Sequence, residues 1–484
     1  MDRLGAAGLW ILRWSHRSAK EPMVRILLTL FTPSRLLNNP VDGVHIHPKD
    51  FRLPSELWGE ILLKATYIPF ELEECPSPCS LLVYQNLNHW VHSRWRQNLP
   101  IRRNIILVSR LWRDIGEKFL YQTAFISSAR VLQSLIFALQ ASRQRVCWVT
   151  RVSIKSNISS LALNQQLGEI LNERNNIRAY QDETMYFPFP LSPTPTNYLR
   201  LRCIVLRSPI ERFWSALPLF VNLEVLKLSN ISLRHAVNVA LPPVSLLHLH
   251  LVEFRFLASA VAEYNLFNIW MPTWKVPKLK TFIVDADNME ILPGIAAHSA
   301  TIANLGLTGS PLQPPSSLNS PSPMRFQTTS LRRVLALHYF GTSSWRHLDG
   351  CIPLHTVREI ELRLEESLGA AVVMANEYGW GSNLQDLGDL FLLTCDGTRT
   401  PSLSRVIVSI WHEDMKIIDK TVRGMFDGWI EKMEKTRPNV RLKLSFGFDD
   451  NGNEWTYDLY SVYQISKLGS PGLTTSSISF SESP

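Results

Sequence analysis

Cysteines and long apolar runs are scarce in this chain. It has 484 residues and six cysteines, of which only Cys75 and Cys79 are close in sequence. Such scatter argues against a disulfide-stapled secreted scaffold and indicates a reducing compartment, so we expect a cytoplasmic or nuclear location. No apolar run approaches the roughly 18 residues that a membrane span needs, and we therefore expect no membrane partner.

Motifs for catalysis and cofactor binding are also missing. The sequence has no Walker phosphate loop, no G-x-G-x-x-G, no G-x-S-x-G and no H-E-x-x-H. Cys75, Cys79, His89 and His92 follow the residue order of a zinc site, but the spacings before and between the histidines are not those of zinc fingers. We therefore predict no cofactor, no metal site and no enzymatic activity. The alternative is an enzyme whose site is assembled across the fold.

Positive charge is present but dilute. The net charge is +8, and the densest basic stretch holds six arginines interrupted by apolar residues. A nucleic-acid binder usually concentrates its charge in a patch or stripe, so we expect no nucleic-acid partner. The arginines are interpreted as a solvated helix face or as the surface of a protein-binding helix. They are Arg94, Arg96, Arg102, Arg103, Arg110 and Arg113.

Composition separates the two ends of the chain from its middle. Residues 1–50 are basic and poor in acidic residues, which predicts a partly disordered extension, with an organelle transit peptide as the alternative. Alternating residues around an Asn-Gly turn predict a hairpin at 448–467. Residues 468–484 are rich in Ser, Thr and Pro and are predicted to form a disordered tail.

Residues 126–447 begin with an amphipathic helix and continue as short apolar strands in one recurring phase, L-x-x-L-x-L. Most steps between successive units are 22 to 33 residues, near the period of leucine-rich repeats. One unit cannot bury its apolar face alone, whereas stacked neighbours bury a continuous core. The predicted core positions are Val149-Val152-Ile154, Leu201-Ile204-Leu206, Leu223-Leu226-Leu228, Leu246-Leu249-Leu251, Leu279-Phe282-Val284, Ile302-Leu305-Leu307, Leu331-Val334-Ala336, Val357-Ile360-Leu362 and Leu403-Val406-Val408.

Two steps in this series are long. The step from 149 to 201 is 52 residues and the step from 357 to 403 is 46. Each has room for one further unit, the second around Leu384 to Leu392. The fold class we predict is α/β, with a small N-terminal helical module followed by an irregular leucine-rich-repeat solenoid.

The helical module is predicted at residues 51–125, with an insertion at about 69–104. Its first helix follows Leu53, with Pro54 at the first turn, where a missing N–H costs nothing, and with Glu56 at the positive end of the helix dipole. A second helix is predicted from Ile105 to Gly116, with an apolar stripe that includes Trp112.

These two segments carry a family resemblance. The opening L-P-x-E-L and the later L-V-S-x-x-W-R resemble the F-box, in particular the F-box-like proteins of mushroom-forming fungi. The resemblance implies that the module docks a Skp-type adaptor, which links it to a cullin ubiquitin ligase. The adaptor-facing residues that it implies are Leu53, Pro54, Leu57, Ile61, Val108 and Trp112.

The resemblance also implies that the repeats hold a substrate protein of unknown identity. The chain is therefore expected to be a substrate-recognition adaptor of a cullin-type (SCF) ubiquitin ligase. Because Leu53 to Trp112 spans 59 positions, more than a compact F-box, the alternative is a repeat scaffold with a degenerate box and no ligase role. The outward strand positions expected to face a substrate are Val205, Lys227, His250, Ile283, Leu335, Glu361 and Ile407.

Overall fold

The computed structural model contains two compact units. A helical unit comprises 54–66 and 98–120, and a sheet unit comprises the other described residues. Neither unit contains a described helix with both the length and the apolar character needed to cross a membrane. The structure describes residues 54–66, 81–155, 161–173, 176–184, 199–209, 211–233, 243–256, 261–285, 292–308, 333–337, 354–364, 394–410, 429–448 and 454–458.

The helical unit is built from α3 (Ser55–Ala65), the last turns of α4 (Leu81–Val108) and α5 (Arg110–Tyr121). The predicted second helix, from Ile105 to Gly116, is in fact the junction of two helices, because the helical pattern is interrupted at Ser109. Much of the predicted insertion is also helical: α4 is 28 residues long and continues through Pro100. The described part of the unit therefore has three helices where two were expected.

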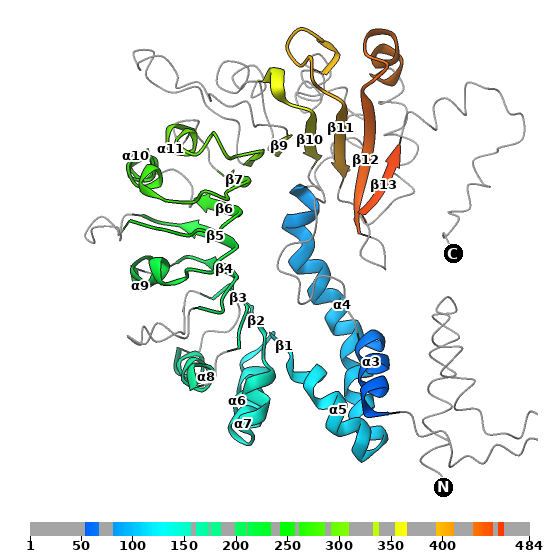
Figure 1. Ribbon diagram of the computed structural model, residues 1–484, viewed down its shortest axis with the longest axis vertical. Coiled ribbons are helices and arrows are strands. Elements are labelled where there is room, and N and C mark those ends of the chain that lie inside the picture. Colours follow the sequence, from blue (N-terminus) through cyan, green and yellow to red (C-terminus); the bar gives the residue numbers. More distant parts are fainter. Residues whose placement is uncertain are drawn as a thin grey trace, which may run out of the picture. The chain divides into compact units, whose positions relative to one another are not determined.

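The sheet unit is mixed α/β and contains a single sheet of 13 strands in chain order (Figure 1). All neighbouring strands are parallel except the last two, which are antiparallel. They form a hairpin, but its strands lie at 441–448 and 454–458, earlier in the chain than the predicted 448–467. The strands are β1 (Thr123–Ile126), β2 (Arg151–Ile154), β3 (Ala179–Asp182), β4 (Cys203–Arg207), β5 (Val225–Ile231), β6 (Leu251–Phe256), β7 (Thr281–Asp285), β8 (Asn304–Thr308), β9 (Arg333–Leu337), β10 (Glu359–Leu364), β11 (Arg405–Ile410), β12 (Arg441–Phe448) and β13 (Glu454–Asp458).

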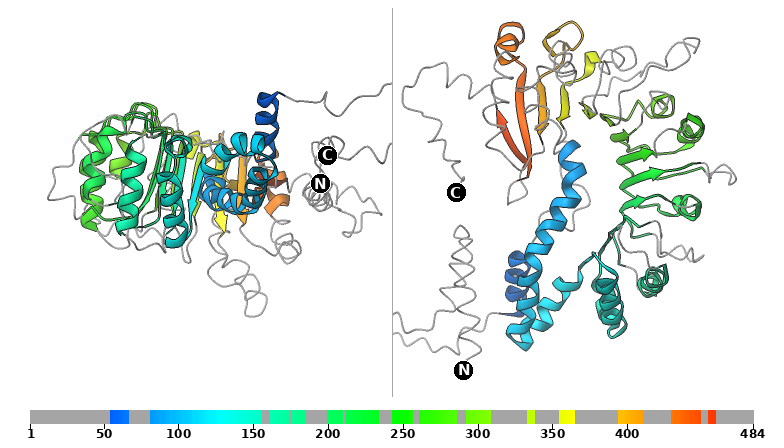
Figure 2. Two further views of the ribbon diagram at one scale, coloured as in Figure 1. Left: turned by 90° about the horizontal axis from the view of Figure 1, so that it is seen from below. Right: turned by 180° about the vertical axis from the view of Figure 1, so that it is seen from behind.

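The described helices between the first eight strands lie on one side of this sheet (Figures 1 and 2). The first of them, α6, confirms the predicted amphipathic connector: Leu132, Ile136 and Leu139 are buried along one face, and the Ser128 hydroxyl accepts a hydrogen bond from the Val131 amide at the helix start. The helices are α6 (Ala129–Gln140), α7 (Arg143–Trp148), α8 (Leu161–Glu173), α9 (Glu211–Ala216), α10 (Val261–Trp270) and α11 (Leu292–Ala296).

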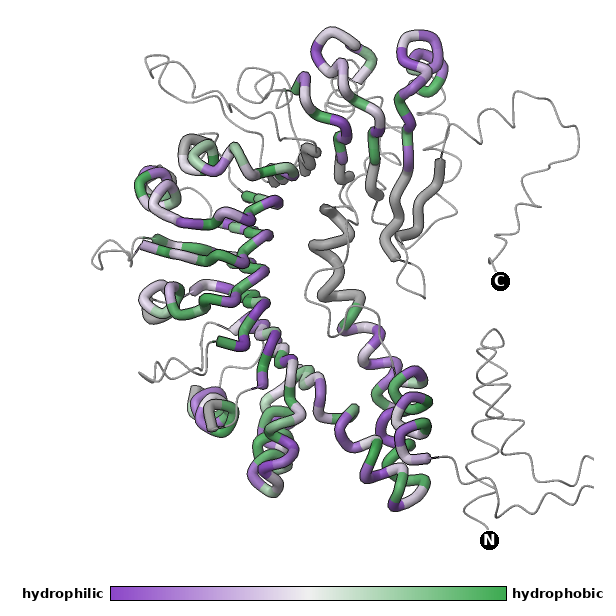
Figure 3. Tube along the Cα trace, viewed as in Figure 1, coloured by the Kyte–Doolittle hydropathy of each residue, from purple (hydrophilic) through white to green (hydrophobic). Residues whose placement is uncertain are grey.

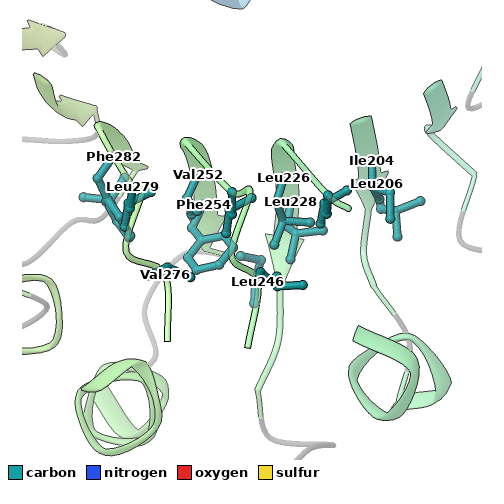
Figure 4. Packing of buried hydrophobic residues seen from close by; sticks show 14 of the residues in the cluster. Ile204, Leu206, Leu226, Leu228, Leu246, Val252, Phe254, Val276, Leu279 and Phe282 are labelled. Carbon is teal, nitrogen blue, oxygen red and sulfur yellow. The ribbon is translucent and has the colours of Figure 1, made fainter. Parts of the chain in front are cut away.

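The predicted phase is visible in the strand register. Ile204 pairs with Leu226, Leu226 with Val252, and Val252 with Phe282. The same row continues through Leu305 and Val334 to Ile360 and Val406. Its described side chains are buried between the sheet and the returning chain (Figure 4). Hydrophobic and hydrophilic residues alternate along parts of the sheet unit (Figure 3), but the opposite strand face also holds a buried apolar cluster that includes Val225 and Leu251.

One repeat was predicted in the wrong frame. The register places Val252 and Phe254 at the inward strand positions of β6, so the preceding core residue is Leu249 and not Leu246. Leu246 is buried in the turn before β6 instead, where its amide donates to the Lys275 carbonyl oxygen at 3.0 Å. The closely spaced leucines at 246, 249 and 251 allowed both frames, and strand pairing selects the later one.

The two long steps have different explanations. The first contains a missed unit: β3 pairs between β2 and β4, with Ile177 and Tyr180 in the core. The second does not, because β10 pairs directly with β11 and leaves no place for a strand between them. Residues 384–392 lie outside the described residues. One further strand, β1, was also missed because 51–125 had been assigned to the helical module.

Candidate functional site

The helical unit has a small apolar core. Leu62 of α3, Ile105 of α4 and Phe119 of α5 are buried against one another. Trp112 packs at the edge of this core, and its ring lies 5.0 Å from that of Trp58. Each helix thus contributes one buried side chain to this cluster, which fixes the face that each turns inward.

Arg102 ties the three helices together. Its side chain is buried, and it donates from Nη2 to the Thr66 carbonyl oxygen at 2.8 Å and from Nη1 to the Phe119 carbonyl oxygen at 3.0 Å. These two carbonyls lie at the C-terminal ends of α3 and α5, where unpaired carbonyls concentrate negative charge. The interpretation of Arg102 as part of a solvated or partner-binding helix face is therefore wrong, because this arginine is buried and its hydrogen bonds join α4 to the ends of α3 and α5.

Ser109 separates α4 from α5. Its hydroxyl accepts a hydrogen bond from the Trp112 amide at 3.1 Å, and its carbonyl accepts one from the Arg113 amide at 2.9 Å. This arrangement is an N-cap, in which a serine side chain satisfies an otherwise unpaired amide of the first turn. The V-S-x-x-W-R motif therefore encodes a helix start and positions the Trp112 ring.

The residues predicted to face an adaptor differ in exposure. Leu57 and Val108 are exposed, at 44% and 40%, and Pro54 is also exposed. Ile61 and Trp112 are half-buried, and Trp112 packs against the core of the unit. Leu53 lies outside the described residues.

Three more aliphatic side chains of the helical unit are exposed and were not predicted. Leu107 is 73% exposed, and Leu63 and Leu111 are each more than two-fifths exposed. Leu107 and Leu111 lie on either side of the Ser109 break, where a continuous helix was expected to bury Leu111. Five aliphatic residues, here called the aliphatic surface, are thus exposed on this small unit: Leu57, Leu63, Leu107, Val108 and Leu111.

The positions predicted to face a substrate lie mostly in one row of the sheet. Six of the seven are aligned by the register across neighbouring strands, and His250 is the exception. Glu253 holds the place predicted for His250, because β6 follows the later frame. His250 lies just before β6, and burial lowers the pKa of its imidazole. The six aligned residues are Val205, Lys227, Ile283, Leu335, Glu361 and Ile407.

This row is largely buried, contrary to the expectation that it faces outward. Ile283 and Glu361 are fully buried, Lys227 and Ile407 are less than a tenth exposed, and only Val205 is half-buried. The side chain of Leu335 lies outside the described residues. The row therefore contains little open surface for a partner.

Glu253 is the centre of a charge network in this row. Its carboxylate lies 3.3 Å from Lys227 Nζ and 2.8 Å from Arg255 Nη2. Burial alone would raise the pKa of Glu253, but the two cations outweigh burial and hold its pKa below the usual range. A buried carboxylate needs such partners to remain ionised. The network thus stabilises the pairing of β5 with β6.

A second buried carboxyl, that of Asp182, lies on the core side of β3. It accepts hydrogen bonds from the Tyr180 hydroxyl at 2.9 Å and from the Thr184 amide at 2.7 Å. Burial raises its pKa to about 6, although both neighbours lower it. Asp182 is 1% exposed, so this carboxyl is closed to a substrate in the folded chain.

Metal-binding groups do not cluster in the part of the chain that the structure describes. Of the four residues compared with a zinc site, only the His92 side chain is described. It is buried, and its ring lies 4.9 Å from that of Phe125. Cys75 and Cys79 lie outside the described residues.

Comparison with known proteins assigns no family to the chain. No family model matches it, and no curated protein is significantly similar to it.

Proposed function

We propose that the chain is a substrate-recognition adaptor of a cullin-type (SCF) ubiquitin ligase. In this proposal the helical unit is an F-box-like module that docks a Skp-type adaptor protein. The sheet unit is an irregular leucine-rich-repeat solenoid that holds the protein to be ubiquitinated. The chain itself performs no catalytic step, because the ligase supplies the ubiquitin transfer.

The observation that carries the first half of the proposal is the aliphatic surface. Each Å² of apolar area that is removed from water stabilises a fold by about 25 cal/mol. The helical unit has few buried residues, yet five of its large aliphatic side chains remain in contact with water and do not contribute this stabilisation. Exposed apolar patches are typical of protein-docking surfaces, and we propose that these residues contribute to one. Three of them, Leu57, Leu107 and Val108, belong to the motifs that resemble the F-box.

The second half is supported by the strand order and register. Each repeat contributes one strand that pairs only with its neighbours in the sequence, and the inward residues of successive strands are aligned. Repeat arrays extend in this way because each unit completes the core of the next. Proteins with this organisation offer long surfaces that suit the capture of other proteins.

The test is binding of the full chain to a purified Skp-type adaptor, measured by calorimetry. The variant Leu57→Asp/Val108→Asp places two carboxylates on the aliphatic surface and should weaken binding by at least about tenfold, because burial of an unpaired charge is costly. The control, Arg103→Asp/Lys118→Asp, also introduces two carboxylates, at exposed polar positions of α4 and α5, and makes a larger change in net charge. This control should bind within about twofold of the unmodified chain.

The alternative is a repeat scaffold with a degenerate box. The observation in its favour is the 28-residue α4 between the two motifs, far longer than a compact box needs. If the intact chain does not bind the adaptor, or if the two aspartates leave binding unchanged, the adaptor proposal fails. The scaffold would then be the better description.

A further inference from the structure

The residues just before the strands lie along one edge of the sheet. Backbone hydrogen bonds join them from strand to strand: the Arg202 amide donates to the Arg178 carbonyl, the Glu224 amide to Arg202, and the His250 amide to Glu224. The Lys280 amide continues the series by donating to the His250 carbonyl at 3.0 Å. Residues that are 22 to 30 positions apart in sequence are therefore neighbours along this edge, which runs from Arg178 to Lys280.

This edge is strongly basic. Arg178, Arg202 and Lys280 are exposed, and so are three more cations in the same turns. In the described turns before β3 to β7, Glu224 is the single acidic side chain, 3.4 Å from the Arg202 guanidinium. The exposed cations, here called the basic rim, are Arg178, Arg200, Arg202, Lys275, Lys278 and Lys280.

Aliphatic side chains accompany the basic rim. Leu199, Val221 and Leu247 are 43%, 41% and 54% exposed. Each lies five residues before the paired inward residue of its strand, so the three occupy equivalent places in consecutive turns. A single exposed leucine is common on protein surfaces. Here an aliphatic side chain is exposed at the same position of three consecutive turns, so the exposure is a regular feature of this edge.

Between β2 and β6 the edge contains a cleft of roughly 580 Å³. Its lining includes Arg178, Arg200, Arg202, Leu199 and Glu224. The lining also includes two asparagines whose amides hold neighbouring turns together. Asn176 donates to the Cys147 carbonyl oxygen and Asn222 to the Leu199 carbonyl oxygen, both at 2.7 Å.

We propose that the basic rim binds an extended, acidic segment of another protein that carries aliphatic side chains between its carboxylates. The cations would pair with the carboxylates, and Leu199, Val221 and Leu247 would receive the aliphatic side chains. A protein segment fits better than a nucleic acid, because exposed aliphatic side chains accompany the cations at three equivalent positions and the acidic Glu224 lies in the cleft, where a phosphate chain would be repelled. No Phe, Tyr or Trp lines the cleft, and His248 is the one ring available for stacking of bases. As a route for substrate recruitment this inference rests on the proposed function, but the binding itself requires no ligase.

The test uses a fluorescein-labelled peptide of about eight residues in which Glu-Glu and Leu-Leu pairs alternate, so that each face of the extended chain carries both residue types. At about 3.3 Å per residue, it is long enough to cross β3 to β6, whose strands lie about 4.8 Å apart. Binding to the full chain is followed by fluorescence anisotropy without any adaptor protein, so that failure here is distinct from failure of the proposed docking to the ligase. We expect binding that weakens steeply with salt and that is lost when Gln replaces Glu or when Ser replaces Leu in the peptide.

Charge reversal on the rim separates this site from general attraction to a basic protein. Arg178→Glu/Arg202→Glu should weaken peptide binding by at least about tenfold, because attraction becomes repulsion at two neighbouring positions. The control, Arg130→Glu/Arg207→Glu, makes the same charge change on α6 and at the far end of β4, where both arginines are exposed. It should bind within about twofold of the unmodified chain, and circular dichroism should show both variants folded.

Three results would overturn the inference. One is the absence of binding to the Glu-Leu peptide by the folded chain. Another is an equal loss of affinity in the rim variant and in the control variant. The third is a single-stranded uridine oligonucleotide that binds as tightly as the peptide, which would point to a nucleic-acid partner instead.

Discussion

Asp182 occupies a position that the rest of its row gives to apolar side chains. Its register partners in the adjacent strands are Ile154 and Leu206, both buried in the core. Hydrogen bonds from Tyr180 and Thr184 satisfy the carboxyl, yet burial still raises its pKa to about 6. At neutral pH this carboxyl is therefore mostly ionised in the folded chain, but burial makes its ionised form less favourable than it is in the unfolded chain.

This raised pKa makes stability depend on pH. The folded state binds the Asp182 proton more tightly than the unfolded state does, so this group's contribution to stability is greatest below about pH 4 and is lost as the pH rises through about 6. Between about pH 4.5 and pH 7.5 the loss is about 2 kcal/mol. The variant Asp182→Asn has no titrating group at this position. The difference in unfolding free energy, variant minus unmodified chain, should therefore rise by about 2 kcal/mol between about pH 4.5 and pH 7.5. Urea unfolding at a series of pH values measures it.

The control for Asp182→Asn is Glu169→Gln, which removes an exposed carboxylate from α8. Its unfolding free energy should follow that of the unmodified chain at every pH. A difference between Asp182→Asn and the unmodified chain that stays constant with pH would show that burial does not govern this carboxyl.

The same residue explains why β3 could not be predicted from the sequence. Ile177 and Tyr180 fit the apolar phase, but Asp182 places a carboxyl at its third position. A pattern that relies on apolar residues cannot distinguish a buried, hydrogen-bonded carboxyl from a solvated one. The unusual 52-residue step was the one available sign of a further unit, and it carried no information on the place of the strand.

At the scale of elements, the packing of α5 on α4 depends on a glycine. A Cβ placed on Gly116 would lie 2.6 Å from Cγ2 of Ile105, which is closer than carbon atoms approach each other. Cγ2 is a branch at Cβ and cannot move without rotation of the whole buried side chain. The separation of the two helices is therefore set by these two residues.

Gly116→Ala should destabilise the helical unit by about 1–2 kcal/mol, because overpacking outweighs the roughly 1 kcal/mol that alanine gains in helix propensity. In the Ile105→Leu background the branch at Cβ is gone, and the same substitution should become stabilising by up to about 1 kcal/mol. Amide hydrogen exchange in α5 measures both effects. If Gly116→Ala changes the unfolding free energy in the same direction in both backgrounds, the contact with Ile105 does not limit the packing of α5 on α4.

Gly59 of α3 is the matched control. A Cβ there would meet Cγ2 of Ile115 at 3.9 Å, an ordinary contact. Gly59→Ala should therefore stabilise α3 by up to about 1 kcal/mol through helix propensity alone.

The predictability of the elements follows the strength of their local signals. The inward phase of β4, β5, β7 and β8 was predicted correctly, because each of these strands offers a single frame. The frame of β6 was wrong because three leucines allow two frames, and only pairing with β5 decides between them. The break at Ser109 was missed because the apolar pattern runs on through it, although a serine three residues before Trp112 could have indicated an N-cap.

At the scale of the whole molecule, the two units carry surfaces of different chemistry. The aliphatic surface of the helical unit was predicted in part, because Leu57 and Val108 belong to recognisable motifs. The basic rim was not predicted: its cations are spread over 103 positions, from Arg178 to Lys280, and a linear scan for basic stretches selects the arginines near Arg102 instead. Strand register alone brings the rim residues together.

If these two surfaces serve one adaptor, substitutions on one surface should abolish its binding and leave binding at the other surface unchanged. Leu57→Asp/Val108→Asp should lose binding to the Skp-type adaptor and keep its affinity for the Glu-Leu peptide. Arg178→Glu/Arg202→Glu should do the reverse, because the substitutions lie in separately packed units. Beads that carry the Skp-type adaptor should therefore retain labelled peptide only through the unmodified chain, and each variant should abolish retention by breaking a different link. Loss of both activities in either variant would contradict this division of roles, since it would mean that the two units do not bind independently.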